Sequence, residues 1–248
     1  MQHIAPGPAS AAHLRCWRAR QSAPRHRNIL LALCIAGALP LAAASSSAPW
    51  DLSHLAQRAD ALYQPDHRGR IRLAQWQDLI DEYAALDVDQ QLEAVNRFFN
   101  ERLRFDHDSV IWKQSDYWAS PVQSLVAGAA DCEDFTIAKY FTLRQLGVDE
   151  TRLRLTYVKA TEQNQAHMVL AYYASPSSTP LILDNLINPI LTAAQRDDLV
   201  PVYSFNAGGL WLGSARFDSR AATTTPLPRW QELTRKMDDE GFFGPVSP

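Results

Sequence analysis

Three side chains in the second half of the chain, Cys132, His167 and Asp184, have types and an order that suit nucleophilic catalysis. Cys132 opens a predicted helix, where unpaired N–H groups and the positive end of the helix dipole favour a thiolate. His167 lies in a predicted strand, from which it could take the thiol proton and deliver it to a leaving amine. Asp184, at the end of the following strand, could bond the far ring nitrogen and fix its tautomer. The pattern therefore predicts acyl chemistry on a thiol.

Each of these residues also has a structural explanation. A lone cysteine is often a small buried apolar residue. A histidine in a strand is usually a satisfied core or edge residue, and an aspartate before Asn185 at a strand end is usually a turn former. Only the combination of all three, in this order, favours the catalytic interpretation.

The cysteine count strengthens that interpretation, because residues 1–44 have the pattern of a secretory signal peptide. Five arginines are followed by the apolar run 29–41 and an Ala-Ala-Ala end. That run is shorter than the roughly 20 apolar residues of a membrane span, so we expect no stable membrane insertion after cleavage. Cys16 and Cys34 would be removed with the signal, and the exported chain would keep Cys132 alone, unable to form an internal disulfide.

The charge balance argues against a nucleic-acid partner. The whole chain has a formal net charge of -3, but its first 44 residues hold five of the 24 basic residues and none of the 27 acidic ones. Without that segment 19 basic residues face 27 acidic ones, a net charge of -8. A chain this acidic gains little from phosphate neutralisation.

Hydrophobic periodicity divides the remaining chain into a helical part and a strand-rich part. Two or three amphipathic helices are expected over residues 50–104, and one largely buried helix over 131–147. Short connections predict antiparallel pairing among the strands, and a turn at 208–209 predicts another hairpin. The predicted strands are 153–159, 166–173, 181–185, 202–205 and 210–212. The aromatic stretch around Trp112, Tyr117 and Trp118 is interpreted either as core or as the lining of a groove.

Five sequence runs carry a family resemblance, at residues 131–140, 157–160, 164–173, 183–186 and 201–206. They resemble the bacterial transglutaminase-like cysteine proteinases, the LapG-type periplasmic proteases. The resemblance implies an α+β, papain-like fold in which N-terminal helices and a buried cysteine-bearing helix pack on an antiparallel sheet. It also implies that Cys132, His167 and Asp184 form the catalytic triad.

We therefore expect a proteinase domain over residues 45–218, followed at 219–248 by a linker and a short C-terminal helix with its tail. One position departs from the family pattern, because Ala130 stands where a glycine usually precedes the Asp-Cys pair. If that position needs a positive φ, alanine would cost roughly 1 kcal/mol.

The resemblance further implies a calcium cofactor, with Asp131 and Glu133 as metal ligands. Calcium takes six to eight oxygen ligands, so two carboxylates would need further donors. The alternative is that Asp131, Glu133 and Asp134 only cap the helix and compensate its dipole. The group 106–108 (Asp-His-Asp) has an awkward spacing for a transition metal and is interpreted as a solvated loop.

The family's biology supplies expectations about partners. LapG-type enzymes act in the periplasm and cut the N-terminal region of a large surface adhesin near paired alanines, which disperses biofilm. An inner-membrane receptor for cyclic diguanylate restrains them. Two other functions stay open from the residues: transfer of the same thioester to an amine, as in a transglutaminase or amidase, and a catalytically silent periplasmic binding module in which Cys132 is buried.

Overall fold

The computed structural model describes residues 51–212, 220–221 and 227–243 of the chain. All of these residues belong to the unit Ser45–Pro248, and the predicted signal peptide at 1–44 lies outside the described residues. Within the described ranges, no helix combines the length and the apolar character that a membrane crossing demands.

Three helices make up the first part of this unit: α1 (Leu52–Tyr63), α2 (His67–Tyr83) and α3 (Val88–Arg102). Each begins with an aspartate N-cap whose carboxylate accepts a backbone N–H bond from three residues further on. The caps are Asp51, Asp66 and Asp87. The expected helices are therefore present, and local capping chemistry sets where each one starts.

A short ladder that the sequence analysis did not predict connects two loops. Strand β1 (Arg104–Phe105) pairs in parallel with β2 (Ala129–Ala130). The Asp106 N–H continues the ladder with a 3.0 Å bond to the Ala130 carbonyl. Helices α4 (Asp108–Ile111) and α5 (Pro121–Ala127) lie between the two strands in sequence. The ladder holds the chain before α4 beside the residues that lead into the helix beginning at Cys132.

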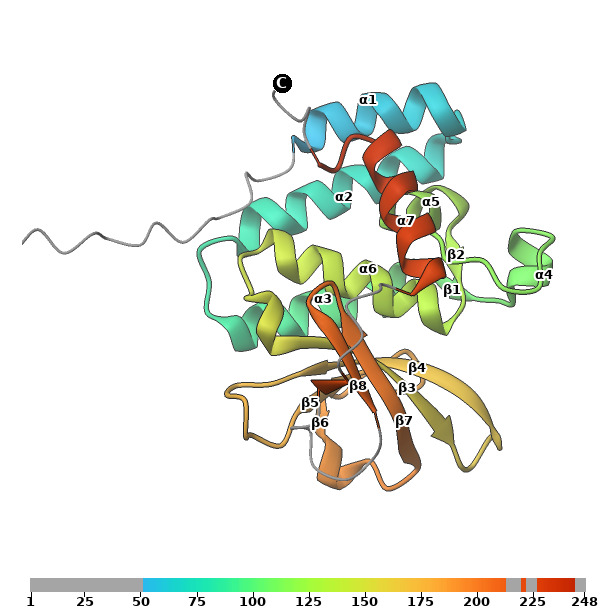
Figure 1. Ribbon diagram of the computed structural model, residues 1–248. Helices are drawn as coiled ribbons and strands as arrows, with labels where there is room; N and C mark the ends of the chain where they lie inside the picture. Colours follow the sequence, from blue (N-terminus) through green and yellow to red (C-terminus); the bar gives the residue numbers. More distant parts are fainter. Residues whose placement is uncertain (1–50, 213–219, 222–226, 244–248) are drawn as a thin grey trace, which may run out of the picture. The chain divides into compact units, whose positions relative to one another are not determined.

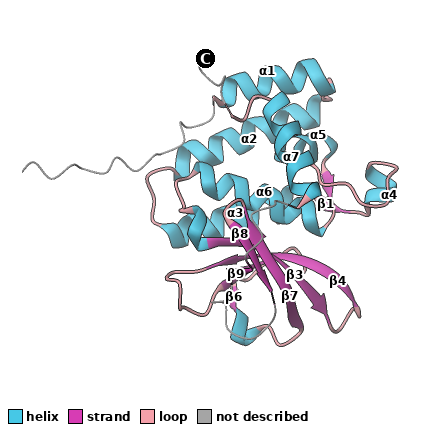
Figure 2. Ribbon diagram, viewed as in Figure 1, coloured by secondary structure: helices cyan, strands magenta, loops and turns pink. Residues whose placement is uncertain are grey.

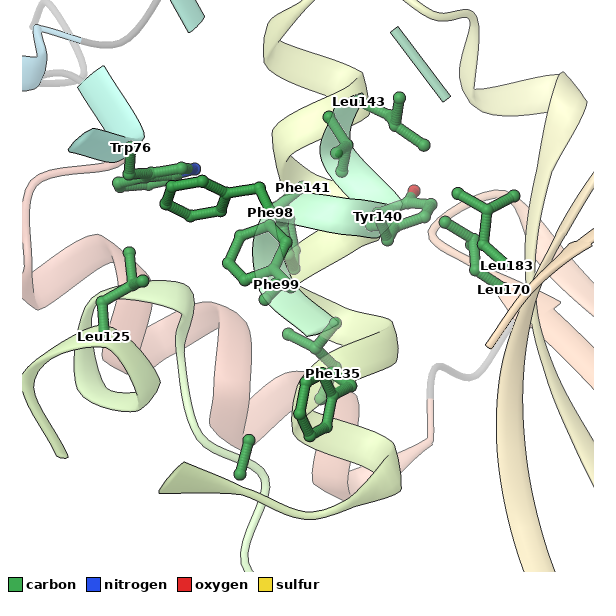
Figure 3. Packing of buried hydrophobic residues seen from close by; sticks show 14 of the residues in the cluster. Trp76, Phe98, Phe99, Leu125, Phe135, Tyr140, Phe141, Leu143, Leu170 and Leu183 are labelled. Atoms are coloured by element: carbon green, nitrogen blue, oxygen red, sulfur yellow. The ribbon is translucent and has the colours of Figure 1, made fainter. Parts of the chain in front are cut away.

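Helix α6 (Cys132–Gln145) is the predicted buried helix, and it runs through the centre of the core. Figure 3 shows Trp76 and Leu125 on one side of it and the sheet residues Leu170 and Leu183 on the other. The Trp76 indole N–H also donates to the Thr142 hydroxyl at 2.9 Å. Such a helix cannot shift along its axis without opening cavities, so its first turn is held firmly.

The strands that follow α6 form one antiparallel sheet, and the α-helices lie on one of its faces (Figures 1 and 2). Among the described residues its order is β6-β5-β4-β3-β7-β8-β9. The sheet and helices confirm the α+β class, and the predicted hairpins are present. The strands are β3 (Leu153–Ala160), β4 (Gln165–Tyr172), β5 (Leu181–Leu183), β6 (Leu191–Thr192), β7 (Leu199–Asn206), β8 (Gly209–Leu212) and β9 (Arg220–Ala221), with 3-10 turns η1 (Glu150–Arg152) and η2 (Ala193–Gln195).

The C-terminal helix α7 (Pro228–Asp239) contributes to the same core as the helices before it. Trp230, Leu233 and Met237 are buried, and the Trp230 ring stacks on Phe141 of α6 with centroids 5.5 Å apart. The helix predicted for the tail is therefore part of the core, since the apolar residues on one side of it are buried against the other helices.

Candidate active site

Cys132 is the first residue of α6, and contacts to strand β4 fix its position. The Thr136 hydroxyl, one turn further along, lies 2.8 Å from the Cys132 carbonyl and 3.0 Å from the Met168 carbonyl. The Met168 backbone N–H also bonds the Cys132 sulfur. Met168 directly follows His167 in β4, so the thiol meets the strand next to the residue that carries the imidazole.

The thiol environment differs from the expectation of a low pKa. Burial, followed by the charge of Glu133 and its hydrogen bond, raises the pKa of Cys132 above its ordinary value. The thiol donates to Glu133 Oε2 at 2.8 Å. The expectation was wrong for this structure because the helix end is crowded with carboxylates, which oppose the dipole.

His167 and Asp184 are in direct contact. The Nε2–H group of His167 donates to Asp184 Oδ1 at 2.8 Å, and the two side chains are only 3% and 0% exposed. Burial works to raise the pKa of Asp184, but His167, the Leu186 N–H and Arg196 together lower it to about 2. The carboxylate is therefore ionised and aimed at one ring nitrogen, which leaves the other nitrogen for proton transfer.

Two residues that the sequence analysis missed donate hydrogen bonds to Asp184. Arg196 Nη2 donates to Asp184 Oδ2 at 2.7 Å, and Asn100 of α3 donates to the Asp184 carbonyl at 2.8 Å. Neither residue stands in a motif that points to the triad. An arginine 12 residues downstream and an asparagine 84 residues upstream become neighbours only through the tertiary structure.

Three aspartates converge at the start of α6. Carboxylate oxygens of Asp108, Asp131 and Asp134 lie within 4.8 Å of one another. Burial and mutual repulsion raise the pKa of Asp131 to about 10 and that of Asp134 to about 8. Asp108 Oδ1 is buried without a hydrogen-bond partner among the described residues. Clustered hard oxygens, one of them unsatisfied, suit a divalent cation such as calcium.

This cluster contains one of the two expected metal ligands and adds two further aspartates. Asp131 belongs to it and also caps α6, since its carboxylate accepts the Asp134 N–H at 3.2 Å. Glu133, the other expected ligand, accepts the hydrogen bond from the thiol. Asp108 is buried, so the interpretation of its group as a solvated loop was wrong for this residue, because β1 and β2 draw it against α6. Ala130 does not have a positive φ, so alanine is unstrained there.

A cleft of about 470 Å³ opens beside the cysteine helix. Tyr157 and Tyr203 lie in its wall as a parallel stack with centroids 5.2 Å apart. Trp118 both lines the cleft and packs in the core on Phe205, so each interpretation of the aromatic stretch is partly right. Asp131 and Glu133, the neighbours of Cys132 in the chain, lie in the same wall, so the cleft borders the first turn of α6. Its lining comprises Asp108, Ser115, Asp116, Trp118, Asp131, Glu133, Tyr157, Tyr203, Leu227, Pro228 and Arg229.

Known proteins resemble this chain in sequence and in fold. The family described as bacterial transglutaminase-like cysteine proteinase matches residues 77–199. Calcium-bound Legionella pneumophila LapG is 43% identical, with a TM-score of 0.65 over 75% of this chain and 98% of that chain. The EGTA-treated form of the same protein is 43% identical, with a TM-score of 0.66 over 75% and 97%. No curated protein matches the chain. With the sheet, the cysteine helix and these similarities in agreement, the chain belongs to the bacterial transglutaminase-like cysteine proteinase family.

Proposed function

We propose that this protein is a cysteine endopeptidase in which Cys132 is the nucleophile, His167 the general base and acid, and Asp184 the residue that orients the histidine. The buried 2.8 Å bond between His167 Nε2 and Asp184 Oδ1 carries the proposal. A histidine with one ring nitrogen committed to a carboxylate has the other available for a thiol proton.

The reaction follows from these positions. His167 takes the thiol proton, and the Cys132 sulfur attacks the scissile carbonyl carbon of a chain lying in the cleft. The protonated imidazole then donates to the leaving amine as the C–N bond breaks, which leaves a thioester on the enzyme. A water molecule, deprotonated by the same histidine, hydrolyses the thioester and releases the second product. Asp184 stabilises the imidazolium in both halves of the cycle.

We infer that the protein binds calcium through Asp108, Asp131 and Asp134. The unsatisfied Asp108 oxygen and the raised pKa values of its two neighbours support this inference, as does a calcium-bound form of a 43% identical protein. Bound calcium would supply positive charge to buried carboxylates that now repel one another. It would also tie the loop before α4 to the first turn of α6, where the nucleophile lies.

The family resemblance supports a specific biological role. The substrate we propose is the N-terminal region of a large surface adhesin, cut near paired alanines in the periplasm to release adhesion and disperse biofilm. An inner-membrane receptor for cyclic diguanylate is the proposed inhibitory partner. Export through the segment 1–44 accounts for a working chain with one cysteine.

The test uses residues 45–248 and an adhesin fragment that carries a paired-alanine segment. We expect two discrete products with calcium, none with EGTA, and none from Cys132→Ala. A fragment with both alanines replaced by bulky residues serves as the matched substrate control. Product masses separate hydrolysis from amine transfer, since cross-linked or deamidated glutamine in place of cut chains would favour a transglutaminase or amidase. Full activity of Cys132→Ala would refute the mechanism.

A further inference from the structure

The inference concerns how the triad aspartate is held, and it rests on the proposed function. We propose that Arg196 is a positioning residue that fixes Asp184 in a single orientation toward His167, and that Asp198 completes the device by balancing the arginine's charge. The chain of contacts runs from Asp198 through Arg196 and Asp184 to His167. Its arginine and second aspartate lie outside the Cys-His-Asp triad.

The distances show that Arg196 joins two carboxylates. Its Nη2 atom lies 2.7 Å from Asp184 Oδ2 and 2.9 Å from Asp198 Oδ2, and its Nε lies 2.9 Å from Asp198 Oδ1. The remaining nitrogen, Nη1, has no hydrogen-bond partner among the described residues. Every hydrogen bond that the guanidinium makes there therefore goes to Asp184 or Asp198.

The two carboxylate oxygens of Asp184 accept hydrogen bonds from different partners. Oδ1 accepts from His167 and from the Leu186 N–H, while Oδ2 accepts from Arg196. A carboxylate without a bond to Oδ2 could rotate about χ2, and the oxygen facing the imidazole would move with it. With both oxygens bonded and the Asp184 carbonyl held by Asn100, the carboxylate has one orientation.

The charges explain why a second aspartate is present. Arg196 alone would neutralise Asp184 and remove the field that stabilises an imidazolium. Asp198 restores a net charge of about -1 to the group of three, which is the charge that one isolated aspartate would supply. Lys139 of α6 is also buried, and its amine interacts electrostatically with Asp184. His167 of β4 is the remaining titratable neighbour of Asp184.

Stability alone does not account for this network. The Arg196 side chain is only 3% exposed, and buried ion pairs recover little more than the cost of removing their charges from water. An arginine also offers what a lysine cannot, a planar fork that bonds one carboxylate with two nitrogens while reaching a second carboxylate. The geometry points to orientation of Asp184 as its role.

A double-mutant cycle on peptidase activity tests the proposal. Arg196→Met should lower kcat by about 100-fold with little change in KM, since misplacement of a catalytic group by about 1 Å has a cost of that size. In an Asp184→Asn background the same change should alter kcat less than about 2-fold, because the residue it acts through is already altered. Arg196→Lys should restore only part of the loss. Equal losses of kcat in both backgrounds, or no loss in the first, would overturn the proposal.

A spectroscopic readout needs no substrate and separates this proposal from the proposed function. The proton that His167 Nε2 shares with Asp184 should give a downfield NMR resonance in the full mature protein. Arg196→Met should shift or broaden it, and Asp198→Asn should shift it while the Arg196 bond to Asp184 remains. An unchanged resonance in Arg196→Met would refute the positioning role even if cleavage were never observed.

Arg154→Met is the matched control for both measurements. Arg154 is another buried arginine of the same sheet, stacked on Tyr173 and Trp211 with its Cζ atom 4.5 and 4.1 Å from the ring centroids. This change should lower the melting temperature while the His167 resonance keeps its position. A shift of the same size in Arg154→Met would mean that any damage to the sheet reaches His167, which would contradict a specific role for Arg196.

Discussion

Two acidic regions differ in protonation: the three aspartates at the start of α6, and Asp184 at the end of β5 in the sheet. On the α6 side, Asp131 and Asp134 have pKa values raised to about 10 and about 8. On the sheet side, Asp184 is as buried as Asp134 and has a pKa lowered to about 2. Burial favours the neutral acid in each case, so the partners decide the outcome. Asp184 faces His167 and Arg196, whereas the other two face more carboxylates.

Asp184 therefore has its counter-charge within the chain, whereas the three aspartates near α6 have none among the described residues. The sheet side carries its own cation, Arg196, and a hydrogen bond from His167, so the Asp184 carboxylate stays charged without help from solution. The α6 side has three carboxylates and no cationic side chain bonded to them among the described residues. The calcium ion that we propose would supply the positive charge that this side lacks.

Asp184→Asn should have the largest effect. It removes the charge and reverses the hydrogen-bond role opposite His167, so kcat should fall by about 10⁴-fold, as expected when a triad histidine is held in the wrong tautomer. The calcium concentration that gives half-maximal stabilisation should not move. Steady-state kinetics and thermal melts across a calcium titration measure both quantities, and a shifted calcium midpoint would contradict the separation of the two sides.

Calcium removal should be the next largest effect, and it should be confined to the α6 side. Calcium at about 100 times its dissociation constant should stabilise the wild type by about 2.7 kcal/mol, since it binds only the folded chain. Asp131→Asn should abolish most of this gain. Calorimetry with calcium and with EGTA gives the difference, and Asp184→Asn is the control that should keep the full gain. If both variants lost the same amount of calcium stabilisation, the acidic cluster and the triad aspartate would not be independent.

The dependence of stability on pH should have opposite signs on the two sides. Unfolded aspartates have a pKa of about 3.9. Asp134, raised to about 8 when folded, contributes stability below about pH 4 that is lost as the pH rises toward 8. Asp184, lowered to about 2, contributes stability above about pH 4 that is lost as the pH falls toward 2.

Urea unfolding of the calcium-free protein at a series of pH values measures this contrast. The free energy of unfolding should decline between about pH 4 and 8, and Asp134→Asn should flatten that decline. Asp184→Asn should instead flatten the loss on the acid side. A decline toward pH 8 of unchanged steepness in Asp134→Asn would show that the carboxylates do not repel one another as the structure indicates.

Asp106→Asn should have the smallest effect and marks the edge of the acidic group. Asp106 lies two residues before Asp108, but it bonds Arg104 and the His107 N–H and is absent from the converging cluster. Activity, melting temperature and calcium midpoint should stay within error of the wild type. A raised calcium midpoint in this variant would mean that Asp106 also takes part in calcium binding.

Local patterns in the sequence predicted the elements and the chain order of the site. Cys132 could be placed at a helix start because Asp131 and the acidic first turn mark that start, and His167 and Asp184 could be placed on successive strands because strand periodicity is local. The family resemblance supplied the roles. The raised pKa of Cys132 was not predictable, because it depends on the direction in which the Glu133 side chain points.

Patterns that are local along the chain predicted the buried helix, the antiparallel hairpins and the element that carries each residue of the proposed triad. Which charges meet across the fold depended instead on how these elements pack. Asp108 reaches Asp131 through the parallel ladder of β1 and β2, and Arg196 reaches Asp184 through the turn before β7. Electrostatic partnership depends on separation in space, which spacing along the chain does not record.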